Sequence, residues 1–288
     1  MPPLIEVREL THTYSEGTPF QHTAIEQVNF TVQAGEFLAV IGHTGSGKST
    51  LIQHLNGLLK PNHGTVLFQG EDIWKDKKFT RSIRSRVGLV FQYPEYQLFE
   101  ETAFKDIAFG PKNMGLSEDE IRARVLRAAS FVGLSEQLLE QSPFDLSGGQ
   151  KRRVAIAGVI AMEPEVLILD EPTAGLDARG RSEILANIRA YQKAQNAAII
   201  MVSHSMEEVA ELADRLIVMK DGRIDTIGTP SEIFRQAEHL REIGLGAPQV
   251  TEVFARLRAM GFDLPDDVYT LDHAVELLRS LKKGGGHA

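Results

Sequence analysis

Eight residues of the chain have the types and spacing of a phosphate-binding loop. Gly42–Ser49 reads Gly-His-Thr-Gly-Ser-Gly-Lys-Ser and matches G-x-x-x-x-G-K-[ST], between a short apolar run and a helical pattern. Glycines let backbone N–H groups turn inward around phosphate oxygens, and the N-terminus of the helix adds a positive dipole end. We expect Lys48 to neutralise the β- and γ-phosphates of a nucleotide and Ser49 to be a ligand of Mg²⁺. The nucleotide-binding residues predicted here are Gly42, His43, Thr44, Gly45, Ser46, Gly47, Lys48, Ser49 and Thr50.

Two adjacent acids follow another apolar run, Val166–Leu169. In α/β sheets, ligands bind at the carboxyl ends of the strands, which is where Asp170 and Glu171 would lie. We expect Asp170 to hold Mg²⁺ through its water shell and Glu171 to be the general base for the attacking water. Taken alone, a strand that ends in two acids is common, and a solvated strand end is then the simpler interpretation. The phosphate loop in the same chain favours the catalytic interpretation, and the two motifs together predict nucleotide binding, which many kinases also show.

A third motif, Leu-Ser-Gly-Gly-Gln, directly precedes a helical pattern from Lys151 to Ala161. Its serine is placed to cap that helix or to bind an anion, and its glycines expose N–H groups at the positive helix end. A plain helix cap is the simpler alternative. The motif resembles the signature of ATP-binding-cassette ATPases. Its residues are Leu146, Ser147, Gly148, Gly149 and Gln150.

Further elements of that family follow in its order and extend the resemblance over about residues 4–235. Gln92 after a strand resembles the Q-loop, Asp177 ends the D-loop segment Ala-Gly-Leu-Asp, and His204 after the last buried strand resembles the switch histidine. The resemblance implies ATP and Mg²⁺ as cofactors. It implies that His204 contacts the γ-phosphate and is catalytic together with Glu171, and that Gln92 contacts Mg²⁺ and a transmembrane partner.

One aromatic residue, Tyr14, matches the side chain that stacks on adenine in this family. A tyrosine beside a strand can equally serve the packing of a sheet. Both interpretations stay open at the level of the sequence.

Two segments, Val90–Thr102 and Phe109–Asn113, resemble the ATPase subunits of energy-coupling-factor vitamin transporters, in particular the second of two paralogues. This resemblance implies a paralogous or identical ATPase subunit as partner, in a head-to-tail dimer. Each of two Mg-ATP would lie between the phosphate loop of one subunit and the signature of the other. It further implies a transmembrane transducing subunit, exchangeable membrane substrate-binding subunits and a peripheral location at the cytoplasmic face of the membrane. The helical C-terminal segments are implicated in dimer contacts in that family.

Four apolar side chains surround Pro94 just after Gln92: Tyr93, Tyr96, Leu98 and Phe99. We expect them to form an exposed docking patch for a helix of a partner. Ordinary packing inside the protein is the alternative.

The elements that position these residues predict an α/β fold. Residues 4–10 and 28–32 alternate as strands, and later β-rich runs with helical segments between them indicate a parallel sheet. These later runs are Glu36–Ile41, Val66–Phe68, Val87–Phe91, Val166–Leu169 and Ala198–Val202, and the helical pattern after the phosphate loop extends to Leu59. We predict a P-loop ATPase domain over 1–240, with a parallel core, an antiparallel β subdomain, a closing hairpin at 216–227 and an inserted helical subdomain at about 95–162. A small helical module over 241–288 follows, and the amphipathic segments 233–243, 250–260 and 273–281 are each expected to be one helix.

The composition excludes several classes of protein. The 288 residues contain no Cys, which removes thiolate metal sites and cysteine nucleophiles, and the net charge of −8 argues against a nucleic-acid partner. The first eight residues do not predict a signal peptide, and no apolar run reaches the roughly 20 residues of a membrane span. Lys75–Arg86 is basic and is interpreted as a solvated loop, with lipid or nucleic-acid contact as the minor alternative. The last five residues are expected to be disordered.

Four histidines, His12, His22, His54 and His63, show no spacing typical of metal ligands, and we predict no transition-metal site. The function predicted is an ATPase subunit that couples dimer closure to uptake of a vitamin or similar nutrient through separate membrane subunits. A soluble cassette ATPase that acts on nucleic acid or ribosomes is the main alternative. A regulator that binds ATP without hydrolysis is a second one, which the presence of Glu171 and His204 disfavours.

Overall fold

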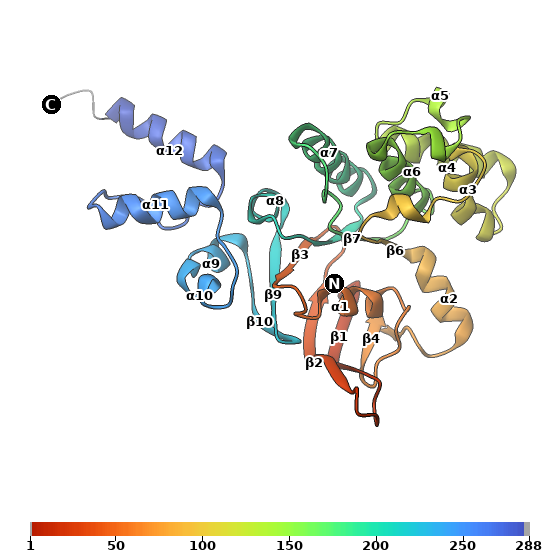
Figure 1. Ribbon diagram of the computed structural model, residues 1–288, viewed down its shortest axis with the longest axis horizontal. Helices are drawn as coiled ribbons and strands as arrows, with labels where there is room; N and C mark the ends of the chain where they lie inside the picture. The colour runs from red at the N-terminus through yellow and green to blue at the C-terminus, as the bar shows by residue number, and fades with distance from the viewer. Residues whose placement is uncertain (1, 285–288) are drawn as a thin grey trace.

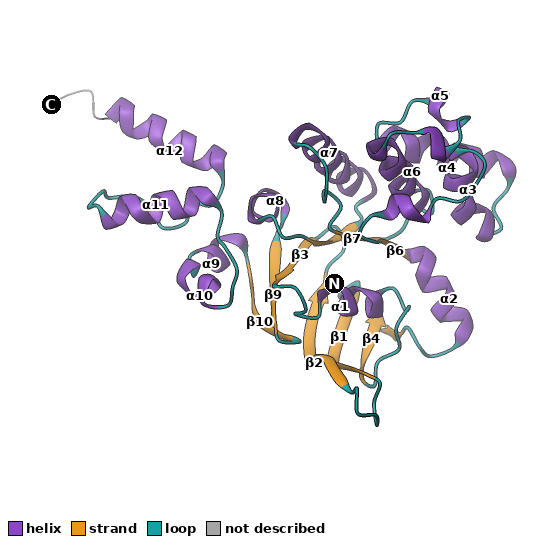
Figure 2. Ribbon diagram, in the orientation of Figure 1, coloured by secondary structure: helices purple, strands orange, loops and turns teal. Residues whose placement is uncertain are grey.

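The computed structural model describes residues 2–284 and contains two β-sheets, a lobe of helices and a C-terminal helical extension (Figures 1 and 2). The strands are β1 (Ile5–Tyr14), β2 (His22–Val32), β3 (Phe37–Gly42), β4 (His63–Phe68), β5 (Glu71–Asp72), β6 (Val87–Val90), β7 (Val166–Asp170), β8 (Ala198–Val202), β9 (Arg215–Lys220) and β10 (Arg223–Gly228). The α-helices are α1 (Lys48–Leu55), α2 (Lys77–Arg86), α3 (Ala103–Asn113), α4 (Glu118–Phe131), α5 (Glu136–Leu139), α6 (Gly148–Ile160), α7 (Ala178–Gln195), α8 (Met206–Leu212), α9 (Pro230–Phe234), α10 (Ala237–Glu242), α11 (Gln249–Ala259) and α12 (Leu271–Gly284). Two short 3₁₀ helices are η1 (Pro94–Gln97) and η2 (Pro143–Asp145).

The central sheet has the strand order β10-β9-β3-β8-β7-β6. All neighbouring pairs are parallel except the hairpin β9–β10, which was expected at these residues. Strands covered on both faces read as continuous apolar runs, and β3, β7 and β8 are buried along their whole length. The phosphate loop follows β3 and the two acids end β7, so the sheet brings both motifs to one edge.

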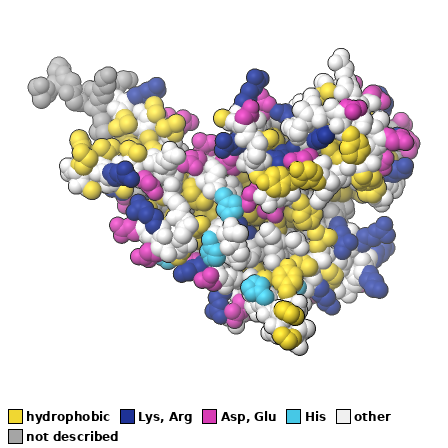
Figure 3. Space-filling model, viewed as in Figure 1, with side chains coloured by type: hydrophobic (Ala, Val, Ile, Leu, Met, Phe, Trp, Pro, Cys, Tyr) yellow, Lys and Arg dark blue, Asp and Glu magenta, His cyan; other side chains and the backbone are white. Residues whose placement is uncertain are grey.

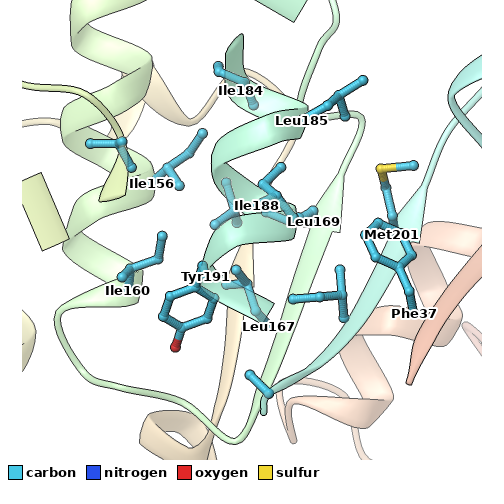
Figure 4. Packing of buried hydrophobic residues seen from close by; sticks show 14 of the residues in the cluster. Phe37, Ile156, Ile160, Leu167, Leu169, Ile184, Leu185, Ile188, Tyr191 and Met201 are labelled. Atoms are coloured by element: carbon cyan, nitrogen blue, oxygen red, sulfur yellow. The ribbon is translucent and has the colours of Figure 1, made fainter. Parts of the chain in front are cut away.

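Alternate residues of these strands enter two different cores, because side chains in a strand point to opposite faces. Phe37, Ala39 and Ile41 of β3 pack with the helices α3, α4, α6 and α7, whereas Leu38 and Val40 pack with α1 and the second sheet. Figure 4 shows the first of these cores, where side chains of α6 and α7 cover the strands. The central strands thus contact the helical lobe with one face and the antiparallel sheet with the other.

The second sheet is antiparallel, in the order β2-β1-β4-β5, and confirms the predicted antiparallel subdomain. Val66–Phe68 was grouped with the parallel runs, and this was wrong: β4 pairs with β1, with Val66 opposite Val7. A short apolar run does not distinguish the two kinds of sheet, because its partner lies far away in the sequence.

The helical lobe consists of α3 to α6, inserted between the neighbouring strands β6 and β7 as predicted. Side-chain oxygens of Thr102, Ser117 and Ser147 cap the helices α3, α4 and α6. Each accepts a hydrogen bond from a backbone N–H in the first turn, which fixes where the helix begins.

Three expectations on helices need correction. The helix after the phosphate loop ends at Leu55 and not at Leu59, because Gly57 takes a positive φ of 69°. The basic segment is not a loop: Asp76 accepts a hydrogen bond from the N–H of Phe79, and α2 follows, with Thr80 and Ile83 buried. The segment 233–243 is divided into α9 and α10 around residues 235–236.

The C-terminal helices have a small core of their own. Phe254, Val268 and Ala274 form a cluster separate from the main core, which extends to Ala247. The domain division at residue 240 remains a prediction. The disorder expected for the last five residues lies outside the described residues, apart from Gly284, which ends α12. Within residues 2–284, none of the helices has the length and apolarity that crossing a membrane requires.

Candidate nucleotide-binding site

A cavity of about 470 Å³ lies at the carboxyl edge of the central sheet and collects most of the predicted site residues. Its walls come from the phosphate loop, from the ends of β1 and β7, and from the segments after β6 and β8. The predicted residues that line it are Tyr14, Thr44, Gly45, Gly47, Lys48, Ser49, Thr50, Gln92, Asp170, Glu171 and His204. His22 and Ala24 of β2 also line it and were not foreseen, because nothing in their spacing suggests a site.

The phosphate loop turns sharply where Gly47 has a φ of 99°. A Cβ atom there would lie 2.6 Å from the carbonyl oxygen of Ala24, so the loop requires glycine for both its conformation and its close approach to β2. Ser46 is buried, and its Oγ has no hydrogen-bond partner among the described atoms. Gly42 and His43 belong to the loop but do not line the cavity.

Lys48 is the buried cation of the site. Its Nζ donates to the carbonyl oxygens of Gly42 at 2.7 Å and His43 at 3.0 Å. Burial lowers the pKa of Lys48, while Glu171 and Asp170 act in the opposite direction. An ammonium that lacks full hydration and faces two acids is suited to a polyanionic ligand.

Ser49 and Asp170 form a set of oxygen donors. Ser49 Oγ lies 3.5 Å from Oδ2 of Asp170. Burial raises the pKa of Asp170, and the neighbouring charge of Glu171 raises it further. Hydroxyl and carboxylate oxygens are the ligands that Mg²⁺ takes, and a cation would relieve the unfavourable burial of the carboxylate. The residues present therefore fit Mg²⁺.

Glu171 is held by contacts to both of its carboxylate oxygens. Oε1 lies 2.8 Å from Nε2 of His204, and Oε2 accepts a hydrogen bond from the Gln92 amide at 2.9 Å. Its backbone has a φ of 50°, and its N–H donates to the carbonyl oxygen of Val202. A glutamate in the left-handed region carries conformational strain, of the kind that proteins retain at functional sites.

Tyr14 ends β1 at the rim of the cavity, with 39% of its surface exposed. Its hydroxyl lies 3.3 Å from Oγ1 of Thr50, and its ring contacts the ring of His12 edge to face. The ring is therefore not buried in the sheet, and it is available to a flat group in the cavity.

The signature lies on the helical lobe and does not line the cavity. Ser147 accepts a hydrogen bond from the N–H of Gln150, and the Gln150 side chain accepts one from the N–H of Ser147. Gly148 and Gly149 face open space, because a Cβ atom at either position would meet nothing within 4 Å among the described residues outside its own stretch of helix. Asp177 caps α7 by accepting from the N–H of Gly180 and is also outside the cavity.

Arg152 is a residue of the site region that sequence reasoning missed. It is 2% exposed, its guanidinium binds the carboxylate of Glu95, and it also donates to the carbonyl oxygens of Pro172 and Ala174. It thereby joins the signature helix to the segments after β6 and β7. Because Lys151–Arg153 are three consecutive basic residues, the sequence alone does not indicate which of them is buried.

The expected docking patch borders a groove of about 890 Å³ between α2, α3 and α6. Tyr96 is 84% and Phe99 is 59% exposed, while Leu98 is partly buried against the core. Phe99, Phe109 and Met162 line the apolar part of the groove, and Arg81 and Arg84 of α2 line another side. Figure 3 shows the basic side chains gathered over α2.

Comparison with known proteins places these features in a family. The chain matches the family described as ABC transporter over residues 25–174. It is 57% identical to the energy-coupling factor transporter ATP-binding protein EcfA2 of Clostridium tetani, over 96% of each chain. It is 55% identical to the EcfA2 of Caldanaerobacter subterraneus, over 96% of this chain and 98% of the relative.

Two solved structures are similar in fold. One is cbiO1 of Clostridium perfringens, described as part of the ABC transporter complex cbiONQ, with a TM-score of 0.74, 43% identity and coverage of 84% of this chain and 95% of that one. The other is a dimer of the ATP-binding cassette MJ0796 bound to ADP and Pi, with a TM-score of 0.71, 28% identity and coverage of 78% and 98%.

Proposed function

The chain belongs to the ATP-binding subunits of ABC transporters of the energy-coupling-factor type, and from this premise we propose how its residues bind and hydrolyse ATP to drive import through separate membrane subunits. The single observation that supports the hydrolytic role is the convergence of Lys48, Ser49, Asp170, Glu171 and His204 on one cavity. A regulator without hydrolysis would not require a glutamate held between a histidine and an amide.

The phosphate loop binds the triphosphate. Backbone N–H groups of the loop and the Nζ of Lys48 neutralise the β- and γ-phosphates, and the N-terminus of α1 adds its dipole. Ser49 and Asp170 would hold Mg²⁺, which supplies charge neutralisation for phosphoryl transfer when it is bound. The ring of Tyr14 stacks on the adenine base, because it ends at the rim of the same cavity.

Glu171 orients and deprotonates the attacking water. The contacts from His204 and Gln92 keep both carboxylate oxygens directed into the cavity. His204 also contacts the γ-phosphate, and Gln92 links the site to the groove at η1. Movement at the nucleotide is thereby communicated along residues 92–99 to the docking patch.

The signature completes the site of a second ATPase subunit. Ser147 and Gly148 are exposed and Gly149 is half-buried at the N-terminus of α6, and all three lie outside this chain's own cavity. A head-to-tail dimer would place that positive helix end against the partner's γ-phosphate. We propose a paralogue as the natural partner, in keeping with the EcfA2 name of the relatives.

The groove between α2, α3 and α6 receives a cytoplasmic helix of the transmembrane transducing subunit. Its apolar floor and the exposed aromatics Tyr96 and Phe99 fit one face of an amphipathic helix. Exchangeable substrate-binding subunits would join through that same membrane component. The chain would then lie at the cytoplasmic face of the membrane, held by its partners.

Co-purification tests this proposal. The chain, expressed with its native partners and extracted in mild detergent, should co-purify with membrane subunits and hydrolyse ATP. A vitamin or similar nutrient should accumulate only in vesicles whose complex contains an intact Glu171. Association with ribosomes or nucleic acid in place of membrane subunits would favour the alternative function, which the net charge of −8 disfavours.

A further inference from the structure

Four residues, Tyr14, His12, His54 and Thr50, form a closed ring of contacts beside the nucleotide cavity. The ring of Tyr14 meets the ring of His12 edge to face, with centroids 4.5 Å apart and planes at 80°. Nδ1 of His12 lies 3.2 Å from Nε2 of His54, and Nδ1 of His54 lies 2.7 Å from the carbonyl oxygen of Thr50. The hydroxyl of Thr50 closes the ring at the hydroxyl of Tyr14.

The two histidines of this ring are buried: His54 is 0% and His12 is 9% exposed. Burial lowers the pKa of both imidazoles, that of His54 to about 4, so the pair is neutral near pH 7. A neutral imidazole has one donor nitrogen and one acceptor nitrogen. The groups that each ring contacts therefore decide which of its nitrogens carries the proton.

One arrangement of protons satisfies both the contact with Thr50 and the contact between the two histidines. The carbonyl oxygen of Thr50 only accepts, so Nδ1 of His54 carries the proton and its Nε2 is the acceptor. His12 must then donate from Nδ1 to His54. The contact with His54 and a hydrogen bond to the backbone of Lys60 restrain the His12 ring, and this ring is the surface against which Tyr14 packs.

We propose that His12 and His54 are positioning residues that hold the ring of Tyr14 in the orientation in which it stacks on the base of the nucleotide. This inference rests on the proposed role of Tyr14. Thr50 and His54 both belong to α1, which begins at the phosphate loop, so the ring ties the base-stacking side chain to the phosphate-binding element. The base and the triphosphate are thereby both positioned relative to α1.

The proposal separates base recognition from phosphate recognition, and two probes measure these separately. One probe is ATP with Mg²⁺, and the other is inorganic triphosphate with Mg²⁺, which has no base. Binding of both to the full chain is measured by calorimetry at pH 7.5 for the wild type, Tyr14→Ala, His12→Ala, His54→Leu and the double variant Tyr14→Ala with His12→Ala. The control is His63→Ala, which removes an exposed histidine outside the cavity.

Tyr14→Ala should weaken ATP binding roughly 5- to 150-fold, the range of a lost base–aromatic stack, and leave triphosphate binding unchanged. His12→Ala and His54→Leu should weaken ATP binding several-fold, again without an effect on triphosphate. The double variant should bind ATP no more weakly than Tyr14→Ala alone, because the histidines act through Tyr14. His12→Gln, which retains a donor of similar reach, should recover part of the loss and also serves if His12→Ala does not fold.

Three results would overturn the inference. Equal losses for ATP and triphosphate would show that the histidines only support the phosphate loop. Additive losses in the double variant would show that they do not act through Tyr14. If His12→Ala and His54→Leu bind ATP like the wild type while Tyr14→Ala binds it more weakly, the histidines have no positioning role, although Tyr14 keeps its own. If Tyr14→Ala itself binds ATP like the wild type, the proposed stacking by Tyr14 fails first, and the two failures are distinguishable.

Discussion

Arg152 of α6, which is buried, and Glu95 of η1, which is half-buried, form an ion pair with two hydrogen bonds, from Nε at 3.1 Å and from Nη2 at 3.0 Å. The remaining terminal nitrogen of Arg152 donates to the loop after β7. The helix that carries the signature is therefore fastened to the segment after Gln92 and to the loop after Glu171. One buried guanidinium thus contacts both of the segments that follow the nucleotide contacts Gln92 and Glu171.

Replacement of Arg152 tests this junction. Arg152→Gln leaves the half-buried carboxylate of Glu95 without its cation and should lower the free energy of unfolding by about 2 kcal/mol, between the scales for exposed and fully buried pairs. Urea denaturation measures the loss. The matched control is Arg179→Gln, which breaks the exposed pair with Glu183 and should remain close to the wild type. Equal stabilities of the two variants would contradict a structural role for Arg152.

Glu171→Gln should keep ATP binding but slow hydrolysis about 10²- to 10⁴-fold, because an amide cannot accept the proton of the attacking water. The variant should also accumulate as an ATP-bound dimer, which gel filtration would detect. Glu140→Gln, an exposed change on the helical lobe, is the control and should hydrolyse normally. Turnover near the wild-type rate in Glu171→Gln would remove Glu171 from its role.

The docking patch is tested by Tyr96→Ser combined with Phe99→Ser. Both side chains are exposed and neither belongs to the phosphate loop, so assembly with the membrane subunit should weaken while ATP affinity stays unchanged. Pull-down from detergent measures the assembly. Phe20→Ser removes an aromatic side chain that is as exposed as Tyr96 but does not line the groove, and this variant should assemble normally. Unfolding of the double variant would instead assign the two residues to the core.

Lys48→Ala and Ser147→Arg should damage different composite sites. Lys48 neutralises the nucleotide in its own chain, so its loss should abolish photo-crosslinking of ATP to this chain alone. Ser147→Arg should spare the first crosslinking of both subunits but prevent closure over the ATP of the partner. Ser130→Arg, on the exposed surface of α4, is the control. Loss of this chain's own ATP binding in Ser147→Arg would mean that the signature acts in cis.

The stability of the chain should fall between pH 7 and pH 5 in part because of His54. Burial lowers its folded-state pKa to about 4, below the ordinary value near 6.5, so the stabilisation is full above pH 6.5 and is lost as the pH falls toward 4. At pH 5 the loss from this residue should be about 2 kcal/mol. His54→Gln should show a correspondingly smaller decrease in unfolding free energy, and an equal decrease in both proteins would exclude His54 as a cause.

Much of the site could be predicted because its chemistry depends on local sequence. Gly47 and Lys48 follow a strand and begin a helix, and Asp170 ends a strand, so period, turn residues and composition are enough to place them. The signature serine could also be placed, because a capping box is complete within four residues.

The remaining features depend on partners far away in the sequence. The buried contact of His12 with His54 joins residues 42 positions apart, and the junction of Arg152 with Glu95 joins residues 57 apart. The positive φ of Glu171 is imposed by the fold against the preference of the residue. The basic helix α2 was missed because six cations hid the two buried positions, Thr80 and Ile83, by which it packs.

The order of strands in the central sheet also limits how far the chain can fold while it is being synthesised. β3 lies at the middle of the sheet, but its two neighbours, β8 and β9, are more than 150 residues later in the sequence. At roughly 5 to 20 residues per second, the ribosome delivers those neighbours about 8 to 30 s after β3. Throughout that interval the apolar segment Phe37–Ile41 has neither of its parallel partners, so the central sheet cannot close around β3 until residues 198–220 have been made.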